Sequence, residues 1–280
     1  MKILCQIKSY KDIVILEADK ARQIVVLDKT DFDFKVTDAL RELHAKRLSR
    51  DPTSSLLRKL NELKKLAELP FDLKEACNPP MYACAPLLFF KIKTHKSTLP
   101  LRPLVSKRCS PIYNLEVALL KFLTPFFPPS KFTVTSSETL ISRIKNLKLS
   151  QTDKLYSLDV VSLFPSVPIK QVIEIILSQL KSFFPAKQLI TIEKALNLVL
   201  FNNYFRVGNN FYLQEQGCPM GSPLSPFIAE IALTYIEENI VDFYPLAPTL
   251  YVRYVDVIFQ IILMLFYSIK DISFSPSYIK

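Results

Sequence analysis

The sequence of 280 residues predicts an α+β fold, and three observations support this class. Segments with apolar residues at helical spacing alternate with short β-rich segments bounded by turn residues, which is the pattern of a mixed fold. The ranges 12–32 and 204–215 each hold two strand-like runs joined by polar residues, which predicts two antiparallel hairpins. Hydrophobic residues make up 49% of the chain and charged residues 22%, so the chain can bury a sizeable core.

Six segments have the periodicity of amphipathic helices. They are 54–69, 113–127, 137–149, 170–184, 186–203 and 227–244. Ser54 or Ser55 is the predicted N-cap of the first helix, and Pro70 is expected to end it. Either Ser136 or Ser137 is the predicted N-cap of the third helix. We therefore expect helices whose apolar faces cover a core.

Two later β-rich segments each carry one carboxylate among apolar residues. Asp159 lies in the segment 154–169, and Asp256 lies in a predicted strand over 250–259. A buried carboxylate is costly unless it is paired or holds a metal ion. On adjacent strands the two carboxylates would repel each other unless a cation bridged them, and Mg²⁺ takes oxygen ligands. The alternative is that each Asp pairs with a nearby basic residue, for which Arg253 is the obvious candidate.

The charge distribution favours a polyanionic partner. The net charge is +10, with a pI of about 9.3. Nucleic acid is the commonest polyanion, although a soluble basic surface explains the net charge equally well. Between residues 79 and 111 the chain is rich in proline, and its stretch KIKTHKSTLPLRPLVSKRCSP holds no acidic residue. Because a solvated face normally mixes both signs, this stretch favours phosphate contact.

The cysteines and the apolar runs argue against several classes of protein. The five cysteines are scattered without a C-x-x-C pair, which argues against a zinc site and a disulfide scaffold and indicates a reducing, intracellular compartment. The longest apolar run, Ile261–Tyr267, is shorter than the ~20 residues that a membrane helix needs. We therefore expect a soluble protein without a membrane partner.

Five sequence strings occur in order between residues 12 and 259. They are EADKARQIVVLDKTDF, KTHKSTLPLRPLVSKRCSPIYNL, LYSLDVVSLFPSVPI, QGCPMGSPLSPFIAEIAL and RYVDV. The fourth string contains Gly217 and Gly221, two of only three glycines, so its backbone is expected to adopt an unusual conformation. Together the strings resemble the motifs of reverse transcriptases, most closely those of the Penelope-like retroelement type. The string RYVDV stands where the family has Tyr-x-Asp-Asp.

The resemblance implies a right-hand polymerase, in which an antiparallel palm sheet is backed by the helices at 170–203 and 224–244. It assigns residues 1–52 to an N-terminal extension with the first fingers element, 53–153 to the fingers with the basic region, 154–259 to the palm and 260–280 to a tail that does not match the family. This tail has no room for a thumb or an endonuclease domain. We therefore expect a truncated copy in which the thumb is missing.

The resemblance also assigns the residues of a site. Asp159 and Asp256 would be catalytic and would hold two Mg²⁺ ions, for which Mn²⁺ can substitute, with the Val160 carbonyl as a further metal ligand. The nucleotide-binding residues would be Lys93, Lys96 and Arg102 on the triphosphate, with Phe164, Gln216 and Gly217; the template-primer residues would be Lys20, Gly221, Ser222, Pro223 and Tyr254. Phe164 would exclude a 2′-hydroxyl and select dNTPs, but a core Phe is an equal alternative. Lys20 is also explained as a surface lysine.

Two positions depart from the family pattern. Val257 replaces the second adjacent Asp, so the protein supplies less negative charge to the two ions, and Ala21 replaces a glycine. We predict weak ion binding and slow or absent RNA-directed DNA synthesis from a primer 3′-OH on an RNA or DNA template. The chain is then an impaired reverse transcriptase domain or a non-catalytic remnant that binds nucleic acid. A basic protein-interaction domain would leave the string at 217–226 unexplained.

Overall fold

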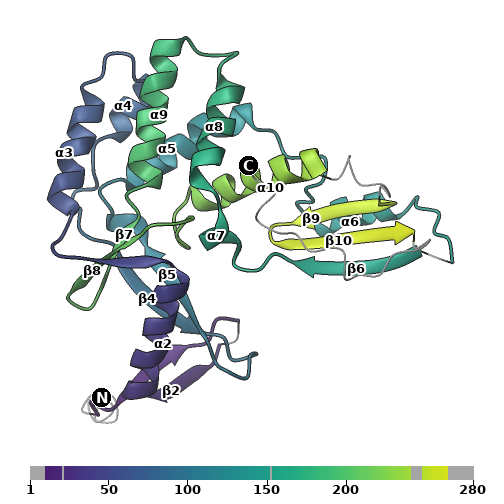
Figure 1. The fold of residues 1–280 in the computed structure, drawn as a ribbon, viewed down its shortest axis with the longest axis horizontal. Coiled ribbons are helices and arrows are strands. Elements are labelled where there is room, and N and C mark those ends of the chain that lie inside the picture. The colour runs from purple at the N-terminus through teal and green to yellow at the C-terminus, as the bar shows by residue number, and fades with distance from the viewer. Residues whose placement is uncertain (1–9, 21, 152, 241–247, 264–280) are drawn as a thin grey trace. The chain divides into compact units, whose positions relative to one another are not determined.

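The computed structural model describes residues 10–20, 22–151, 153–240 and 248–263. The chain folds into two compact units, each built from two stretches of sequence (Figure 1). Unit 1 holds Met1–Phe126 and Phe164–Ile228, and unit 2 holds Phe127–Leu163 and Ala229–Lys280. Helices accompany largely antiparallel sheets, so the predicted α+β class is confirmed. The predicted boundaries at 52, 153 and 259 stay predictions.

Unit 1 contains a two-stranded hairpin and a five-stranded sheet. The hairpin pairs β1 (Ile13–Glu17) with β2 (Ile24–Asp28), as the sequence predicts. The sheet has the order β3-β8-β7-β4-β5, with β3 at Ala45–Leu48, β4 at Leu87–Ile92, β5 at Leu101–Ser106, β7 at Tyr204–Val207 and β8 at Asn210–Gln214. Its pairings are antiparallel except that of β4 with β7. The predicted hairpin at 204–215 is therefore confirmed.

The helices of unit 1 pack through apolar faces. They are α2 (Lys29–Glu42), α3 (Thr53–Lys64), α4 (Phe71–Ala76), α5 (Tyr113–Leu123), α8 (Ile169–Leu180) and α9 (Ala186–Leu200), with the short α7 (Leu163–Ser166) and the 3₁₀ turns η1 (Lys107–Cys109) and η2 (Thr124–Phe126). Leu115, Leu119 and Leu123 of α5 are fully buried because residues four apart share one helix face. Within the described ranges, no helix is long and apolar enough to cross a membrane.

Unit 2 is built on a three-stranded antiparallel sheet. The strand order is β6-β10-β9, with β6 at Asp153–Asp159, β10 at Val257–Leu263 and β9 at Leu250–Tyr254. Leu250, Val252 and Ile261 of this sheet pack against apolar side chains of α6 (Ser137–Ile144). The helix α10 (Ser225–Ile240) begins in unit 1 and continues into unit 2. Of the predicted tail, residues 264–280 lie outside the described residues.

The prediction of a single strand over 250–259 is wrong, because this segment is a hairpin. Tyr254, the last residue of β9, pairs with Val257, the first residue of β10. Val255 and Asp256 are left as a two-residue turn between the strands. Asp256 is therefore a turn residue and not the middle of a strand.

The ends of the helices agree with the sequence at some positions only. The helix α3 begins after Pro52, which occupies the N-cap, so neither predicted serine caps it. It ends at Lys64, well before the predicted stop at Pro70. The predicted cap of α6 is confirmed, because Ser136 Oγ accepts a hydrogen bond from the Thr139 backbone N–H at 3.2 Å.

Candidate functional site

Asp159 and Asp256 lie at neighbouring points of the unit 2 sheet, although they are far apart in the sequence. Asp159 is the last residue of β6 and pairs with Val257, the first residue of β10. The Val160 backbone N–H donates to the Asp256 carbonyl oxygen at 2.8 Å. The end of β6 and the β9–β10 turn are thus joined backbone to backbone. The structure brings the two acidic residues to one end of the sheet, where β6 ends and the β9–β10 turn lies.

Basic residues do not neutralise these two carboxylates within the described chain. No described side chain forms an ion pair or hydrogen bond with the carboxylate of Asp159 or Asp256, and Arg253 binds Glu230 and Glu237 instead. The predicted alternative, in which Arg253 pairs with one of the two aspartates, is therefore wrong. Asp159 is exposed and Asp256 is half-buried. The expectation of deeply buried carboxylates is wrong for Asp159, because it ends its strand at the surface.

Val257, which the sequence resemblance aligns with an Asp of the family motif, lies directly opposite Asp159. The residue is 41% exposed. Opposed residues of antiparallel strands present side chains to the same face, with Cβ atoms about 5 Å apart. No cluster of three or more His, Cys, Asp or Glu side chains suited to a metal ion occurs among the described residues. Two carboxylates with the Val160 carbonyl are oxygen donors that fit Mg²⁺ when a substrate supplies further oxygens.

The turn that carries Asp256 has an unfavourable backbone. Val255 has a φ of +56°, a left-handed conformation that β-branched residues rarely adopt. The Arg253 guanidinium donates from Nη1 to the Val255 carbonyl at 3.1 Å. This contact ties the turn to a side chain that is itself wholly buried. Surrounding contacts of this kind are what a strained turn needs in order to persist.

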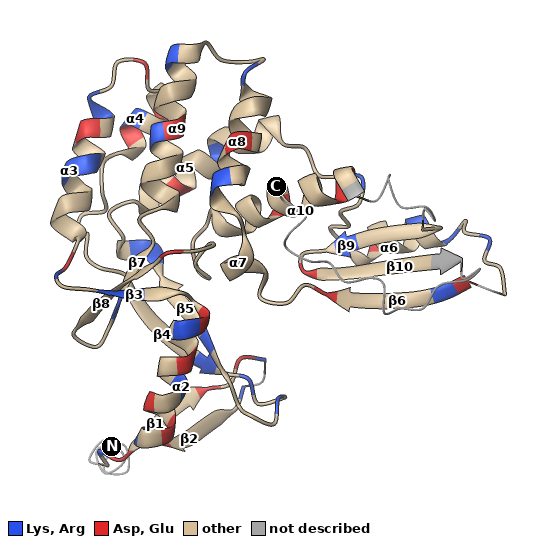
Figure 2. Ribbon diagram, viewed as in Figure 1, with Lys and Arg blue, Asp and Glu red and all other residues tan. Residues whose placement is uncertain are grey.

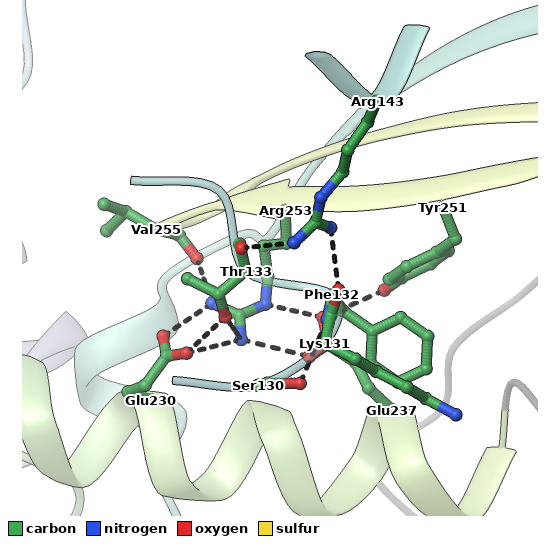
Figure 3. Close-up of polar contacts among 10 residues, drawn as sticks. All are labelled: Ser130, Lys131, Phe132, Thr133, Arg143, Glu230, Glu237, Tyr251, Arg253 and Val255. Atoms are coloured by element: carbon green, nitrogen blue, oxygen red, sulfur yellow. Dashed lines mark hydrogen bonds and ion pairs between the residues drawn. The ribbon is translucent and has the colours of Figure 1, made fainter. Parts of the chain in front are cut away.

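Arg253 connects the sheet of unit 2 to α10 (Figure 3). Its Nε and Nη2 bind the Glu237 carboxylate at 2.6 and 3.0 Å. Its Nη1 and Nη2 bind the Glu230 carboxylate at 2.8 and 3.1 Å. The Thr133 hydroxyl donates to Glu230 at 2.6 Å, and the Tyr251 hydroxyl donates to Glu237 at 3.2 Å. One planar guanidinium thus holds two carboxylates in bidentate pairs, the geometry for which arginine is suited.

Burial and the guanidinium shift the pKa values of this network in opposite directions. At Glu230 burial favours the neutral acid, but hydrogen bonds from Arg253 and Thr133 outweigh it and lower the pKa. At Glu237 burial outweighs the guanidinium and raises the pKa. Burial and the Glu237 carboxylate raise the pKa of Tyr251, so its hydroxyl stays a hydrogen-bond donor. The two carboxylates are therefore held by one guanidinium although burial affects them differently.

Gly217 in unit 1 occupies a position where no side chain fits. Its φ is +64°, and a Cβ atom there would lie 2.3 Å from the carbonyl oxygens of Phe164 and Pro165. The next residue, Cys218, donates its backbone N–H to the Phe164 carbonyl at 2.8 Å. The loop is therefore seated directly on the backbone of α7. The packing of the chain alone requires glycine at 217, while the predicted contact with nucleotide or template stays a prediction.

Gly221 makes a second close backbone contact. Its φ is +110°, and a Cβ atom there would lie 2.2 Å from the Val105 carbonyl oxygen at the end of β5. The Val105 N–H donates to the Met220 carbonyl at 2.8 Å. The string at 217–226 is thus held between α7 and β5. Two of the three glycines are explained by this double contact.

A buried ion network contacts the same loop through the side chain of Ser222. The Lys107 ammonium binds the Glu116 carboxylate at 3.0 Å and the Asn203 side-chain oxygen at 3.2 Å. The Ser222 hydroxyl donates to the other Glu116 oxygen at 2.9 Å. The side chains of Lys107 and Glu116 are 1% and 0% exposed. Ser222, predicted to lie near template and primer, is buried, and its hydroxyl is used inside the protein.

The predicted triphosphate residues gather on the β4–β5 hairpin and the loop that joins its strands (Figure 2). Arg102 Nη1 lies 3.2 Å from the carboxylate of Asp19, whose side chain is 6% exposed. Burial, the guanidinium of Arg102 and the ammonium of Lys96 lower the pKa of Lys93. A lysine whose positive charge is disfavoured by neighbouring cations gains from a bound anion. The hairpin therefore has the charge pattern of an anion site.

The predicted site residues fall into three groups within the two units. One end of the unit 2 sheet carries Asp159, Val160, Tyr254 and Asp256. The N-terminal and β4–β5 hairpins of unit 1 carry Lys20, Lys93, Lys96 and Arg102. The helix α7 and the loop seated on it carry Phe164, Gln216, Gly217, Gly221, Ser222 and Pro223. Sequence reasoning missed the buried pairs of Arg253 and of Lys107. The sequence indicates such pairs only by an isolated charged residue within an apolar segment. This pattern does not identify the residue with which the charge pairs.

Comparisons with known proteins show the fold of the chain. No protein-family model and no curated protein matches the sequence. The structure is similar to telomerase from Candida albicans in complex with the TWJ fragment of telomeric RNA, with a TM-score of 0.57 and 9% identity over 93% of this chain and 46% of that chain. It is similar to apo telomerase from Candida tropicalis truncated from its C-terminal domain, with a TM-score of 0.56 and 10% identity over 90% and 52%. The chain spans about half the length of these telomerases. Its fold resembles the fingers and palm of these telomerases.

Proposed function

We propose that the chain is the reverse transcriptase domain of a retroelement of the Penelope-like type, and that its RNA-directed DNA synthesis is impaired. The observation that carries the proposal is the pairing of the Asp159 strand end with the Asp256 turn, where both carboxylates are free of basic partners among the described residues. The fold supports the polymerase, and the sequence strings support the retroelement type. The telomerase from Candida albicans is in complex with RNA, and the charge of +10 fits a polyanionic partner here.

The proposal assigns a role to the predicted site residues of each unit taken by itself. Asp159, Asp256 and the Val160 carbonyl would hold two Mg²⁺ or Mn²⁺ ions, which would neutralise charge and activate a primer 3′-OH. The cations of the β4–β5 hairpin bind the triphosphate of a dNTP, as Arg and Lys bind phosphate elsewhere. Phe164 excludes a 2′-hydroxyl, and Gln216 and Gly217 lie against the nucleotide and template. Lys20, Gly221, Pro223 and Tyr254 lie near template and primer, while the buried Ser222 holds the loop through its hydrogen bond to Glu116.

The second candidate function is a non-catalytic remnant that binds RNA or DNA. Val257 favours it, because the exposed position opposite Asp159 supplies no charge to a site that must gather two divalent cations. Under this alternative the basic residues still bind phosphate, and only the metal site is defective.

Primer extension with Mg²⁺ or Mn²⁺ tests the proposal, with the unmodified chain beside Val257→Asp and Val257→Asn. The Asp variant should raise synthesis at least ~10-fold, while the Asn variant, which has the same shape without the charge, should not. Asp159→Asn in the Val257→Asp chain should abolish the gain. Equal synthesis by the unmodified chain and the Asp variant would show that the chain is not impaired. Synthesis by none of them, with RNA binding intact by fluorescence anisotropy, would favour the remnant.

A further inference from the structure

Cys84 and Cys109 oppose each other at the open end of the β4–β5 hairpin. Leu87 pairs with Ser106 at the start of the ladder, and the same register continued by three residues on each side places Cys84 opposite Cys109. The Cys84 N–H donates to the Cys109 carbonyl at 2.8 Å, so the two residues stay side by side although Cys109 lies in η1 and not in β5. The two side chains are also close enough to share a hydrogen bond, which places their sulfur atoms within reach of a disulfide.

These two cysteines differ from the other described cysteines in access. Cys84 and Cys109 are exposed, whereas Cys77 and Cys218 are buried. Burial raises the pKa of Cys77 to about 11 and that of Cys218 to about 12, so both stay protonated and inert. Burial and the neighbouring Cys109 thiol raise the pKa of Cys84. The opposed pair is therefore the accessible pair of thiols in the described chain.

We propose that Cys84 and Cys109 form an oxidation site at which a small-molecule disulfide converts the two thiols into one reversible intramolecular disulfide. One cysteine, as its thiolate, attacks a sulfur of the oxidant and releases one small thiol, which leaves a mixed disulfide on the protein. The thiolate of the second cysteine then attacks the protein sulfur and releases the other small thiol. The two protein thiols are oxidised, the oxidant is reduced to two thiols, and the protons of the cysteines pass to the released thiols.

The cross-link would act on a functional segment without serving as a structural scaffold. It closes a loop from 84 to 109, which contains the whole β4–β5 hairpin and the cations Lys93, Lys96 and Arg102. In a reducing compartment the two thiols stay free, and in an oxidising one they form the disulfide at the base of the hairpin. Because the site is defined by strand register and exposure, it does not depend on the proposed polymerase function.

Oxidised glutathione is the probe that tests the site, in a Cys5→Ser chain so that the residue outside the described ranges cannot compete. After alkylation of the remaining thiols, mass spectrometry of a proteolytic digest should show Cys84 joined to Cys109. Because the second thiol is held beside the first, the internal disulfide should exceed the glutathione adduct at either residue at least ~10-fold. Cys84→Ser should instead accumulate the adduct on Cys109.

Cys218→Ser is the matched control, because it removes a buried thiol and should leave the yield of the cross-link unchanged. Circular dichroism of every variant keeps misfolding separate from a lost cross-link. A stable glutathione adduct on Cys84 while Cys109 is present would overturn the proposal. A cross-link of either residue to a second chain or to a buried cysteine would overturn it as well.

Discussion

The two loops that carry predicted site residues are each braced by a buried ion network, and the two networks are built differently. In unit 2 the planar guanidinium of Arg253 binds two carboxylates and also the turn carbonyl of Val255. In unit 1 the ammonium of Lys107 binds one carboxylate, and that carboxylate in turn holds the loop through Ser222. The guanidinium acts directly on a strained turn, whereas the ammonium acts through an intermediate. The planar guanidinium of Arg253 has enough donors to bind two carboxylates and a carbonyl, whereas the compact ammonium of Lys107 suits a single carboxylate.

Arg253→Met should have the largest effect on stability. Met keeps much of the volume but leaves Glu237 buried without its cation and the Val255 carbonyl without its donor. Removal of one partner from a buried ion pair costs about 3–5 kcal/mol, so unit 2 should lose that much free energy of unfolding. Hydrogen exchange of peptides from β9 and β10 measures the loss locally.

Arg143→Met is the matched control for Arg253. Arg143 also donates two hydrogen bonds, but to the backbone carbonyls of Lys131 and Thr133 at 2.7 and 3.1 Å, and no carboxylate is left unpaired when it is removed. Its loss should cost about 1–2 kcal/mol. Equal exchange in the two variants would contradict the view that the guanidinium is needed for its charge.

Lys107→Met should cost about 3 kcal/mol in unit 1, at the lower end of the same range. The Glu116 carboxylate is left without its cation but keeps the hydrogen bond from Ser222. Lys59→Met is the control, because Lys59 donates to the Asn202 side chain at 3.3 Å on the exposed surface. Denaturant titration should show less than about 0.5 kcal/mol for the control. A loss as large for Lys59 would remove the distinction between the buried and the exposed lysine.

The sequence could predict the loop at 217–226, but not the β9–β10 turn and not how either loop is held. Strand and helix periodicity located most elements, and the order of the strings pointed to Asp159 and Asp256. The sequence does not show the turn at Val255 and Asp256 clearly, because YVRYVDVIF contains no Gly, Asn or Pro and its one turn-forming residue, Asp256, is flanked by valines typical of a strand. Here tertiary contacts of Arg253 impose a positive φ on valine, against its local preference.

The ionic partners could not be predicted because they come from separate elements. Arg253 was paired with an aspartate on grounds of nearness in sequence, but its side chain meets Glu230 and Glu237 of α10. Neighbouring positions on a strand point to opposite faces, so nearness in sequence is a poor guide to contact. Lys107 likewise meets Asn203 from a distant part of the chain.

Gly217→Ala sharpens the comparison by testing steric fit without any change of charge. Both Gly217 and Gly208 have positive φ, but a Cβ at 208 meets nothing within 4 Å, whereas one at 217 meets two carbonyl oxygens at 2.3 Å. Gly208→Ala should cost about 1 kcal/mol for the backbone alone. Gly217→Ala should cost about 2 kcal/mol more, because the loop must shift off α7. Equal costs by denaturant titration would mean that the loop is not seated as tightly as the contacts indicate.

Ser222→Ala should have the smallest effect and separates the ion pair from the loop that it holds. The hydroxyl donates to an ionised carboxylate at 2.9 Å, so its loss should cost about 1.5 kcal/mol. Ser225→Ala is the control in the same loop, because that hydroxyl donates to the neutral Pro219 carbonyl at 2.9 Å and should cost about 1 kcal/mol or less. In the Lys107→Met chain the Glu116 carboxylate loses the Lys107 ammonium and keeps the Ser222 hydroxyl as a donor. Ser222→Ala should therefore cost more in that chain than in the unmodified chain. If the free-energy costs of Lys107→Met and Ser222→Ala simply add in the double mutant, the two residues are not coupled through Glu116.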